Sequence, residues 1–532
     1  MTEIRADVAV IGGGLGGVAA ALAAARHGLT VVLTEETDWV GGQLTAQGVP
    51  PDEHPWIEQF GCTASYRALR EGIRDYYRRA YPLTALARAQ RYLNPGGGAV
   101  SRICAEPRVG LAVIESMLAP YRAAGRLDLR VRQRPVAATT DGDVVTSVTL
   151  ADQDTGERLT VVAPYILDAT ETGELLPLTG TEYVTGFESE HDTGEPSAPA
   201  ERQPLNMQAV SWCFAIDHIE GEDHTIDKPD DYPIWRDFQP PYWPDRMFSL
   251  VAPKPHTLEP IRRTLEPHHD AEFTKQHGGG DLDLWEFRRI VARDNFEPGA
   301  FPSDVVIVNW PMIDYLSGPV FEVDDDDAAH HLEGAKRMSL SFLYWMQTEM
   351  PRIDGGTGLP GLRLRGDVFG TRDGLAKYPY IRESRRIVAE YTVVEQDVSQ
   401  AVRGKDTAAR YDDSVGIGSY RIDLHPSTGG DNYIDVGSLP FQIPLGALLP
   451  VRTRNLLPAA KNIGTTHITN GCYRLHPVEW NIGESAALLA AYCLQHKVAP
   501  HHVRADDAHR RAYQKVLTDH GVELSWPGVH GY

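Results

Sequence analysis

Short apolar runs and small residues alternate regularly at the start of the chain. Val8–Ile11 is an apolar run typical of a buried strand, and an alanine-rich segment of helical composition follows it as far as His27. Gly28 ends that segment, and Thr30–Leu33 is a second run of strand type. Apolar runs of this length, separated by a helical segment and a glycine, predict a strand–helix–strand (βαβ) unit.

The turn between the first strand and the helix carries Gly12-x-Gly14-x-x-Gly17. In such a turn the first glycine permits the tight bend, the second lets the backbone approach a pyrophosphate, and the third allows close packing of helix and strand. The free N–H groups and positive dipole of the helix N-terminus favour phosphate, and they include those of Leu15 and Gly16. Glu35 closes the second strand, where a carboxylate accepts hydrogen bonds from a ribose 2′-hydroxyl.

These features predict a dinucleotide site, against the alternative of a glycine turn without a ligand. The motif does not separate FAD from NAD, and the acid argues against NADP.

The rest of the first third continues as mixed helix and strand. Two amphipathic helices are predicted over 66–81 and 106–124, and the arginines of the first are interpreted as a solvated face. Alternation predicts further strands at 127–131, 136–138, 144–150, 158–162 and 165–167. Asp168–Gly173 then follows the last strand. Its small residues indicate a close approach to a cofactor, with an ordinary strand-to-helix turn as the alternative.

The middle of the chain has a different composition. Gly186–Asn206 is polar and is predicted to be a linker. Proline and aromatic residues then dominate, with strand-like runs at 209–216 and 305–310 and a predicted helix over 382–394. Asp324–Asp327 precedes a helical pattern over 328–350, so the run is expected to cap that helix and form its first turn. Adjacent aspartates do not converge on one ion, and no metal site is predicted.

The C-terminal part returns to short apolar runs separated by small residues. The pattern predicts a strand ending at 455–458, a small-residue loop at 459–466 and an alanine-rich helix over 477–492. The N-terminus of this helix is placed to stabilise a developing negative charge on a ligand.

Composition narrows the classes of partner. The chain has 532 residues and a net charge of −22, with no basic run, which argues against nucleic-acid or anionic-membrane binding. It has no apolar stretch long enough to span a membrane, and the first strand begins too early for a signal peptide, so a cytoplasmic protein is expected. Five widely spaced cysteines give neither a disulfide framework nor a zinc pattern.

With these regions in view, the chain resembles the FAD-dependent oxidoreductase family of glutathione-reductase-like flavoproteins. Fumarate reductase and heterodisulfide reductase flavoprotein subunits are distant relatives. The resemblance rests on VIGGGLGG…VVLTEETDWVGGQLTAQG, YILDATETGELL, VNWP, GLAKYPYIRESRRIVAEYTVVEQDV, and the segment from SLPFQIPLGALL to HPVEWNIGESAALLA. It implies an α/β fold, with a Rossmann-like FAD-binding domain (1–185 and 441–532) and an inserted α+β substrate domain (186–440).

The resemblance also assigns the cofactor and its contacts. The cofactor would be FAD, its pyrophosphate at the glycine turn and its ribose on Glu35. The remaining contacts would be Gly42 and Gln43 near the flavin, Val136 at the adenine edge through its backbone, Ala169 and Thr170 in the same pocket, Asn462 near the ribityl-phosphate and Asn481 at the pyrimidine end. Asn462 departs from the acidic residue of many relatives. After the VNWP segment, Met312 and Ile313 replace a polar pair, which implies a different substrate there.

Hydride transfer to a flavin requires a base near neutral pKa, which favours histidine. The densest group of such residues is His467, Arg474 and His476. His476 is predicted as the base and Arg474 as the anchor of an anionic or carbonyl group, against the alternative that both histidines are satisfied by backbone hydrogen bonds. Further predicted substrate contacts are His425, Arg382, Tyr380 and, capping the pocket from a proline-rich loop, His54.

Three functions stay open on this basis. The first is an FAD-dependent oxidase or dehydrogenase of a small organic molecule; the second is an NAD(P)H-dependent flavin monooxygenase; the third is a non-catalytic or electron-transfer subunit. No second nucleotide motif supports the second, and no iron–sulfur spacing supports the third. Covalent attachment of FAD through a cysteine or histidine and formation of a homo-oligomer also stay open.

Overall fold

A five-stranded parallel sheet brings the two ends of the chain together. The computed structural model describes residues 2–267 and 282–529. The strand order is β23 (Leu456–Pro458), β8 (Tyr165–Asp168), β2 (Val8–Ile11), β3 (Val31–Glu35) and β4 (Leu127–Val131). Because β23 pairs with β8, the C-terminal part completes a sheet begun by the first βαβ unit. A mixed α/β fold with a parallel sheet is confirmed.

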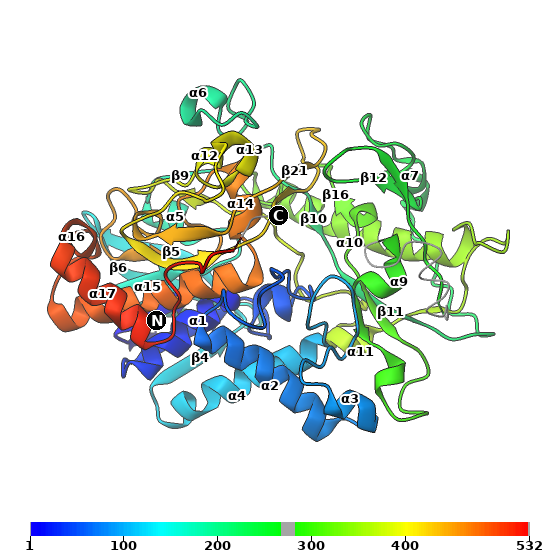
Figure 1. The fold of residues 1–532 in the computed structure, drawn as a ribbon, viewed down its shortest axis with the longest axis horizontal. Helices are drawn as coiled ribbons and strands as arrows, with labels where there is room; N and C mark the ends of the chain where they lie inside the picture. Colours follow the sequence, from blue (N-terminus) through cyan, green and yellow to red (C-terminus); the bar gives the residue numbers. More distant parts are fainter. Residues whose placement is uncertain (1, 268–281, 530–532) are drawn as a thin grey trace.

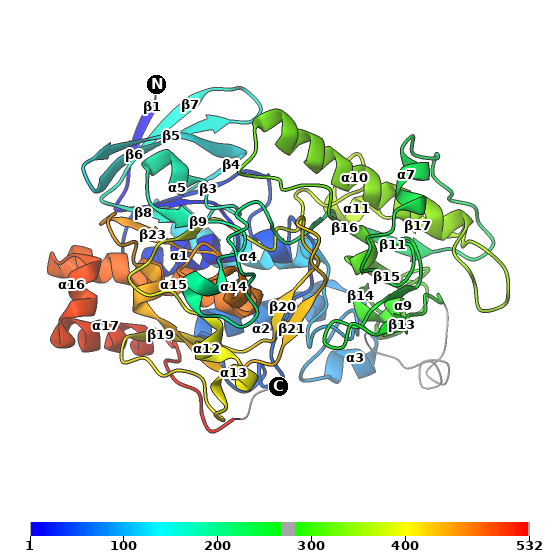
Figure 2. The same cartoon turned by 90° about the horizontal axis from the view of Figure 1, so that it is seen from above.

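Two helices cross closely in front of this sheet. These are α1 (Leu15–Arg26) and α15 (His476–His496), which lie side by side in both views (Figures 1 and 2). A Cβ atom on Gly16 would lie 1.8 Å from the Ala459 carbonyl oxygen, and one on Gly483 would lie 1.9 Å from the Gly16 carbonyl oxygen. Only glycine fits at these positions, so the crossing fixes the N-terminus of α15 next to the glycine turn.

A second sheet covers one side of the first. Its order is β1 (Thr2–Arg5), β7 (Arg158–Val162), β6 (Val144–Asp152) and β5 (Gln133–Asp141). The predicted hairpin at 141–144 joins β5 to β6. The two predicted amphipathic helices are α2 (Ala64–Ala80) and α4 (Pro107–Ala123), which pack against each other.

The middle of the chain, green in the figures, builds a part of its own to one side (Figures 1 and 2). Its antiparallel sheet has the order β14 (Arg289–Val291), β15 (Val305–Val308), β11 (Phe214–His218) and β17 (Leu362–Leu364). The long helix α10 (Asp325–Thr348) begins as predicted, because the Asp324 side chain accepts a hydrogen bond from the Asp327 N–H.

The remaining elements are short. The helices are α3 (Ala85–Ala89), α5 (Leu175–Thr179), α6 (Glu190–Thr193), α7 (Tyr232–Asp237), α9 (Leu284–Phe287), α11 (Gly366–Phe369), α12 (Glu395–Val398), α13 (Gln400–Arg403), α14 (His467–Tyr473), α16 (Pro500–Ala505) and α17 (Asp507–Asp519). The strands are β9 (Tyr183–Val184), β10 (Val210–Ser211), β12 (Val251–Pro253), β13 (Pro260–Arg262), β16 (Asp314–Tyr315), β18 (Arg386–Ile387), β19 (Ser414–Gly418), β20 (Ile422–Leu424), β21 (Ile434–Val436) and β22 (Phe441–Pro444).

Two predictions about the middle of the chain are wrong. The segment 382–394 is not a helix: it is extended, and β18 pairs with β9. The buried Arg386 side chain holds it there by donating hydrogen bonds to the Thr465 and Gly186 carbonyl oxygens. The segment 186–206 is not a free linker, because the fully buried Glu195 within it accepts hydrogen bonds from Thr466 and from the Glu395 N–H.

No helix within the described ranges combines the length and the apolar character needed to cross a membrane.

Candidate functional site

The glycine turn opens on a cavity with about 410 Å³ of space between atoms, part of which is open solvent. Its lining includes six residues predicted for the cofactor: Gly12, Gly14, Glu35, Gly42, Ala169 and Thr170. Gly12 has a positive φ of 100°, and a Cβ atom there would lie 2.2 Å from the Ala169 carbonyl oxygen. A Cβ atom on Gly17 would lie 2.0 Å from the Gly12 carbonyl oxygen. The turn therefore has the bare backbone and close packing that the sequence motif requires.

Two adjacent carboxyl groups lie at the ribose end of this cavity. Glu35 accepts hydrogen bonds from the N–H groups of Gly13 and Thr37, at 2.9 and 2.8 Å. Burial raises the pKa of Glu35 to about 7. Burial and the neighbouring Glu174 charge also raise the pKa of Glu36 to about 7. Glu36, which was not predicted, lines the same cavity as Glu35.

A buried ion-pair group lies directly in front of the glycine turn. Lys461 forms ion pairs with Glu171 and, at 3.9 Å, with Glu479. The Glu479 carboxylate accepts a hydrogen bond from the Gly16 N–H, and a Glu171 carboxylate oxygen lies 2.9 Å from where a Cβ on Gly14 would be. Two carboxylates thus occupy the face of the turn that favours anions. None of these three residues was predicted, because they come from three distant segments.

The other predicted cofactor residues are arranged differently. Gln43 lies close to the turn, and its amide donates to the Arg474 carbonyl oxygen at 2.9 Å. Val136 is 37% exposed, while its neighbour Pro135 lines the cavity. Asn462 donates to the Asp168 carbonyl oxygen, and Asn481 donates to Val415 and Ser485. The Asn462 and Asn481 side chains therefore donate hydrogen bonds within the protein, and their contacts with FAD stay a prediction.

The predicted catalytic pair lies at the N-terminus of α15 and is fully buried. One Arg474 NH group donates to the Tyr380 hydroxyl at 2.7 Å, and another donates to the Asp423 carbonyl oxygen at 3.0 Å. His476 accepts from the Asp52 N–H on Nδ1, and its Nε2 lies 3.2 Å from the Val49 carbonyl oxygen. Burial lowers the His476 pKa to about 3. Both ring nitrogens are occupied by backbone, which counts against the base role and favours the alternative of a structural histidine.

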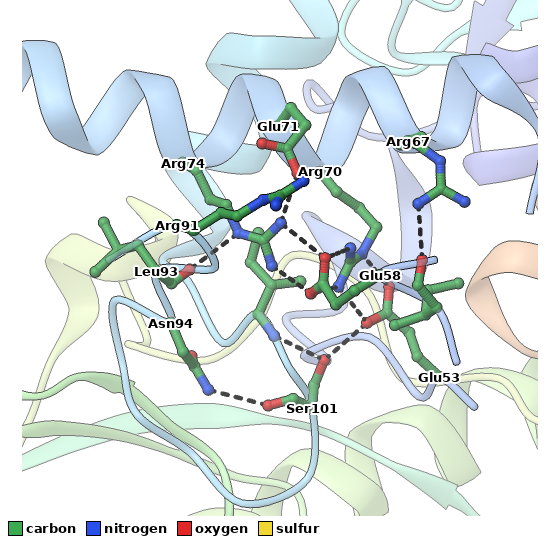
Figure 3. A network of polar contacts seen from close by, with 12 residues as sticks. Glu53, Glu58, Arg67, Arg70, Glu71, Arg74, Arg91, Leu93, Asn94 and Ser101 are labelled. Carbon is green, nitrogen blue, oxygen red and sulfur yellow. Dashed lines mark hydrogen bonds and ion pairs between the residues drawn. The ribbon is translucent and has the colours of Figure 1, made fainter. Parts of the chain in front are cut away.

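A buried network of ion pairs between this loop and helix α2 fixes the loop that bears Asp52 (Figure 3). Arg70 binds both Glu53 and Glu58, and Arg74 binds Glu58 and donates to the Leu93 carbonyl oxygen. Arg70 and Arg74 are 1% and 0% exposed, which corrects their interpretation as a solvated face. Because Glu53 is anchored in this way, its neighbour Asp52 is held at the centre of the molecule.

Two of the histidines predicted for the site, His54 and His467, are held by contacts other than those around Asp52. His54 is directed from the loop toward the Gly61 carbonyl oxygen and Trp526, with its ring centroid 5.1 Å from that of Trp526. Asp52, and not His54, is therefore the loop residue that faces Arg474. His467 forms a buried ion pair with Glu383 at 2.9 Å and stacks on Phe187. These contacts indicate structural roles for both histidines.

His425 is the predicted residue whose surroundings are those of a base. Its Nδ1 lies 2.6 Å from a carboxylate oxygen of Asp314, which is fully buried. Arg382 forms an ion pair with the same carboxylate at 3.0 Å, and the Ser211 hydroxyl donates to it at 2.6 Å. The His425 side chain is 17% exposed, and its Nε2 has no hydrogen-bond partner in the described part of the chain. Arg382 thus pairs with the Asp314 carboxylate, and its contact with a substrate stays a prediction.

Several segments meet around Asp52. Burial raises the pKa of the Asp52 carboxyl, and the charges of Arg288, Arg474 and His425 act in the opposite direction. The Tyr420 hydroxyl lies 3.5 Å from the Asp52 carboxylate. Sequence reasoning missed Asp52, Asp314 and Arg288 because no motif marks them. The available signals were weak: Asp52 follows a proline pair, Asp314 follows the VNWP segment, and Arg288 lies in a polar turn.

The fold and the glycine turn define a dinucleotide-binding α/β protein, and comparison with known proteins identifies its family. The model of the family described as FAD dependent oxidoreductase matches residues 7–517. The chain belongs to that family, and FAD is its cofactor. The residues present fit this cofactor, since the bare glycine cradle and the carboxyl groups of Glu35 and Glu36 are what its pyrophosphate and ribose require.

Similar solved structures are numerous but distant. L-proline dehydrogenase from P. horikoshii is 16% identical, over 36% of this chain and 25% of that chain, with a TM-score of 0.17. Glycerol-3-phosphate dehydrogenase from Bacillus halodurans, complexed with FAD, is 16% identical over 41% of each chain, with a TM-score of 0.25. The flavin-dependent monooxygenase PieE, in complex with FAD and substrate, is 17% identical over 41% and 36%, with a TM-score of 0.23. The chain thus spans between a quarter and about two fifths of their length. No curated protein matches.

Proposed function

We propose that this oxidoreductase oxidises a small organic molecule at a carbon that bears a hydroxyl or amino group. The observation that carries the proposal is the pairing of His425 with the buried Asp314, next to the residues around Asp52. Oxidation of such a group removes a hydride from carbon and a proton from oxygen or nitrogen. The bound FAD would supply the two-electron acceptor for that hydride.

The Asp314 carboxylate sets the state of the histidine. Although burial alone would raise it, the charge of Arg382 and the hydrogen bonds from His425 and Ser211 lower the pKa of Asp314, so the carboxyl group is ionised. An ionised carboxylate at 2.6 Å keeps the proton on Nδ1 of His425. The lone pair on Nε2 is then available to take the substrate proton, which is the arrangement of a general base with an orienting acid.

Other residues would position the substrate. Arg474 and the Tyr380 hydroxyl, which are 2.7 Å apart, would bind a polar group of the substrate, as predicted for both. His476 would hold the Asp52 loop through its two backbone contacts. The FAD pyrophosphate would lie at the glycine turn and its ribose at Glu35 or Glu36. The glutathione-reductase-like subtype and an inserted substrate domain over 186–440 are part of this proposal, and the pairing of β23 with β8 supports them.

The proposal is tested on the FAD-loaded protein under anaerobic conditions, with amines, alcohols and hydroxy acids as candidate substrates. We expect one class to bleach the flavin absorbance. A His425→Ala variant should slow the bleaching by about 10²- to 10⁴-fold while keeping its FAD. His191→Ala, a substitution of an exposed histidine, is the matched control.

Two results would contradict the proposal. One is bleaching at an unchanged rate in His425→Ala. The other is no bleaching by any candidate, together with NAD(P)H consumption that depends on added substrate, which would indicate a monooxygenase.

A further inference from the structure

A groove adjoins the cofactor cavity and opens to solvent. The cavity and the groove share four lining residues, which are Glu36, Pro135, Glu174 and Tyr378. The groove has about 1270 Å³ of space between atoms, part of which is open solvent. A dinucleotide bound at the glycine turn is therefore next to an opening on the protein surface.

The segment 317–323, which joins β16 to α10, contributes to the wall of this groove and is loosely packed. Val320 and Phe321 line the groove and also a smaller cavity, with about 270 Å³ of space between atoms that includes open solvent. Gly318 and Pro319 line that cavity and a third, more open hollow. Atoms that border empty space lose packing contacts, so this segment moves at a lower cost than a closely packed one.

The carboxylate of Glu322 ties this segment to the cofactor-binding part of the chain. It accepts hydrogen bonds from the Tyr183 hydroxyl at 3.1 Å and from Arg385 Nε at 2.6 Å. An NH group of Arg385 also donates to the Thr172 carbonyl oxygen at 3.0 Å, and its guanidinium carbon lies 5.0 Å from the centre of the Phe321 ring. Because Thr172 follows β8 of the parallel sheet and lines the groove, Arg385 links the segment to the edge of the cofactor cavity.

Glu322 is held in an unfavourable backbone conformation. Its φ of 62° lies in the left-handed region, which costs free energy for a residue other than glycine. Such a conformation persists where the surrounding contacts enforce it. The contacts of the carboxylate thus keep the segment in place against the preference of its own backbone.

We propose that the segment 317–323 is a gate for FAD, and that the contacts of Glu322 with Arg385 and Tyr183, the latch, hold the gate closed. Breaking the latch relieves the strained backbone and lets the segment move into the space beside it, which widens the groove next to the cofactor cavity. Glu322 lines the groove but is not part of the lining of the cofactor cavity. Loss of the latch should therefore speed the entry and the release of FAD by the same factor and leave the affinity unchanged. The inference rests on FAD as the cofactor and not on the proposed oxidation.

The test measures FAD exchange in Glu322→Asn. Asparagine tolerates the left-handed conformation, so this variant removes the carboxylate contacts with little change to the backbone. Release is followed on the FAD-loaded protein by exchange against excess radiolabelled FAD, and binding is followed by flavin fluorescence after removal of the cofactor. Both rates should rise about tenfold, because hydrogen bonds to a charged group are lost, while the dissociation constant should change by less than about twofold.

Two further variants make the test specific. Tyr183→Phe removes one of the two donors to Glu322 and should raise both rates by a smaller factor, about two- to threefold. It tests the gate by itself if Glu322→Asn does not fold. Asp325→Asn replaces another carboxylate that lines the groove, and within the described ranges Asp325 forms no ion pair, so both rates should stay unchanged.

Several results would overturn the gate. Faster release with an unchanged rate of binding would mean that Glu322 contributes to the affinity for FAD. Unchanged rates in both latch variants, or no exchange of FAD in any of the proteins, would show that the cofactor does not pass through this groove. Equal acceleration in Asp325→Asn would assign the effect to the charge of the groove. All of these rates are measured without a substrate, so failure of the proposed oxidation would leave the gate intact, and failure of the gate would leave the oxidation intact.

Discussion

Two groups of buried arginines in this protein differ in how their charges are balanced. Arg70 and Arg74 are enclosed by Glu53, Glu58 and Glu71 (Figure 3), and their charges are fully paired. Within the described ranges, Arg288 has no counter-ion and Arg474 keeps an unpartnered Nε. The first group serves the scaffold, since it anchors the loop that bears Asp52. The second keeps buried donors without a partner in that part of the chain. Burial of a charge alone does not distinguish the two roles, but its partners do.

The largest expected effect is on stability, in the paired group. Glu58→Ala should lower the free energy of unfolding by about 3–5 kcal/mol, because Glu58 neutralises two buried arginines at once. Denaturant unfolding of the protein would measure this. Asp75→Ala, which breaks an exposed pair with Arg78 on the same helix, should cost no more than about 1 kcal/mol. Equal losses in the two variants would show that the network of Figure 3 is not a structural anchor.

The next effect is on catalysis, at the pair of His425 and Asp314. Asp314→Asn should lower kcat/KM by about 10²-fold or more, because an amide no longer fixes the Nδ1 proton of His425. The pH profile of the variant should shift along with its rate, which a purely structural role would not cause. Flavin content and thermal midpoint should be checked in the same preparation. An unchanged profile would remove Asp314 from the mechanism.

Histidine burial gives a smaller effect, measurable through pH. The folded His476 has a pKa lowered by burial to about 3, so it stays neutral while the unfolded chain takes up a proton below about pH 6.5. Its contribution to stability is therefore complete above that pH and is lost as the pH falls, at about 1.4 kcal/mol per pH unit. Urea unfolding at about pH 7.5, 6.5 and 5.5 should show the stability difference between the protein and His476→Asn narrowing by that amount. A constant difference would mean that the histidine is not held neutral.

The smallest expected effect is on the affinity for FAD, and it concerns Lys461, a paired cation next to the glycine turn. Lys461 is neutralised by Glu171 in front of the glycine turn, where the pyrophosphate of FAD belongs. Glu171→Gln should tighten FAD binding by about two- to fivefold, because it removes a repelling charge and frees the lysine. Fluorescence titration of FAD would measure it. Glu174→Gln, in the same cavity, should change it less. Weaker binding in Glu171→Gln would show that the carboxylate supports the cofactor.

The sequence predicted the cofactor half of the molecule far better than the substrate half. The glycine turn, β2, α1 and β3 depend on local pattern, so spacing alone predicted this unit and the close packing at Gly12 and Gly17. The pairing of His425 with Asp314 joins residues 111 positions apart, which no periodicity encodes. The helix predicted over 382–394 failed because Arg382 and Arg386 form buried tertiary contacts that override local propensity.

The contrast between the arginines is tested most directly by one pair of variants, Arg70→Met and Arg288→Met, with thermal midpoints measured side by side in the absence of substrate. We expect opposite results: a large fall for Arg70→Met, which leaves Glu53 buried without a cation, and no fall or a rise for Arg288→Met. A fall of equal size in both variants would contradict the proposed division of roles, because Arg288 would then be part of the scaffold.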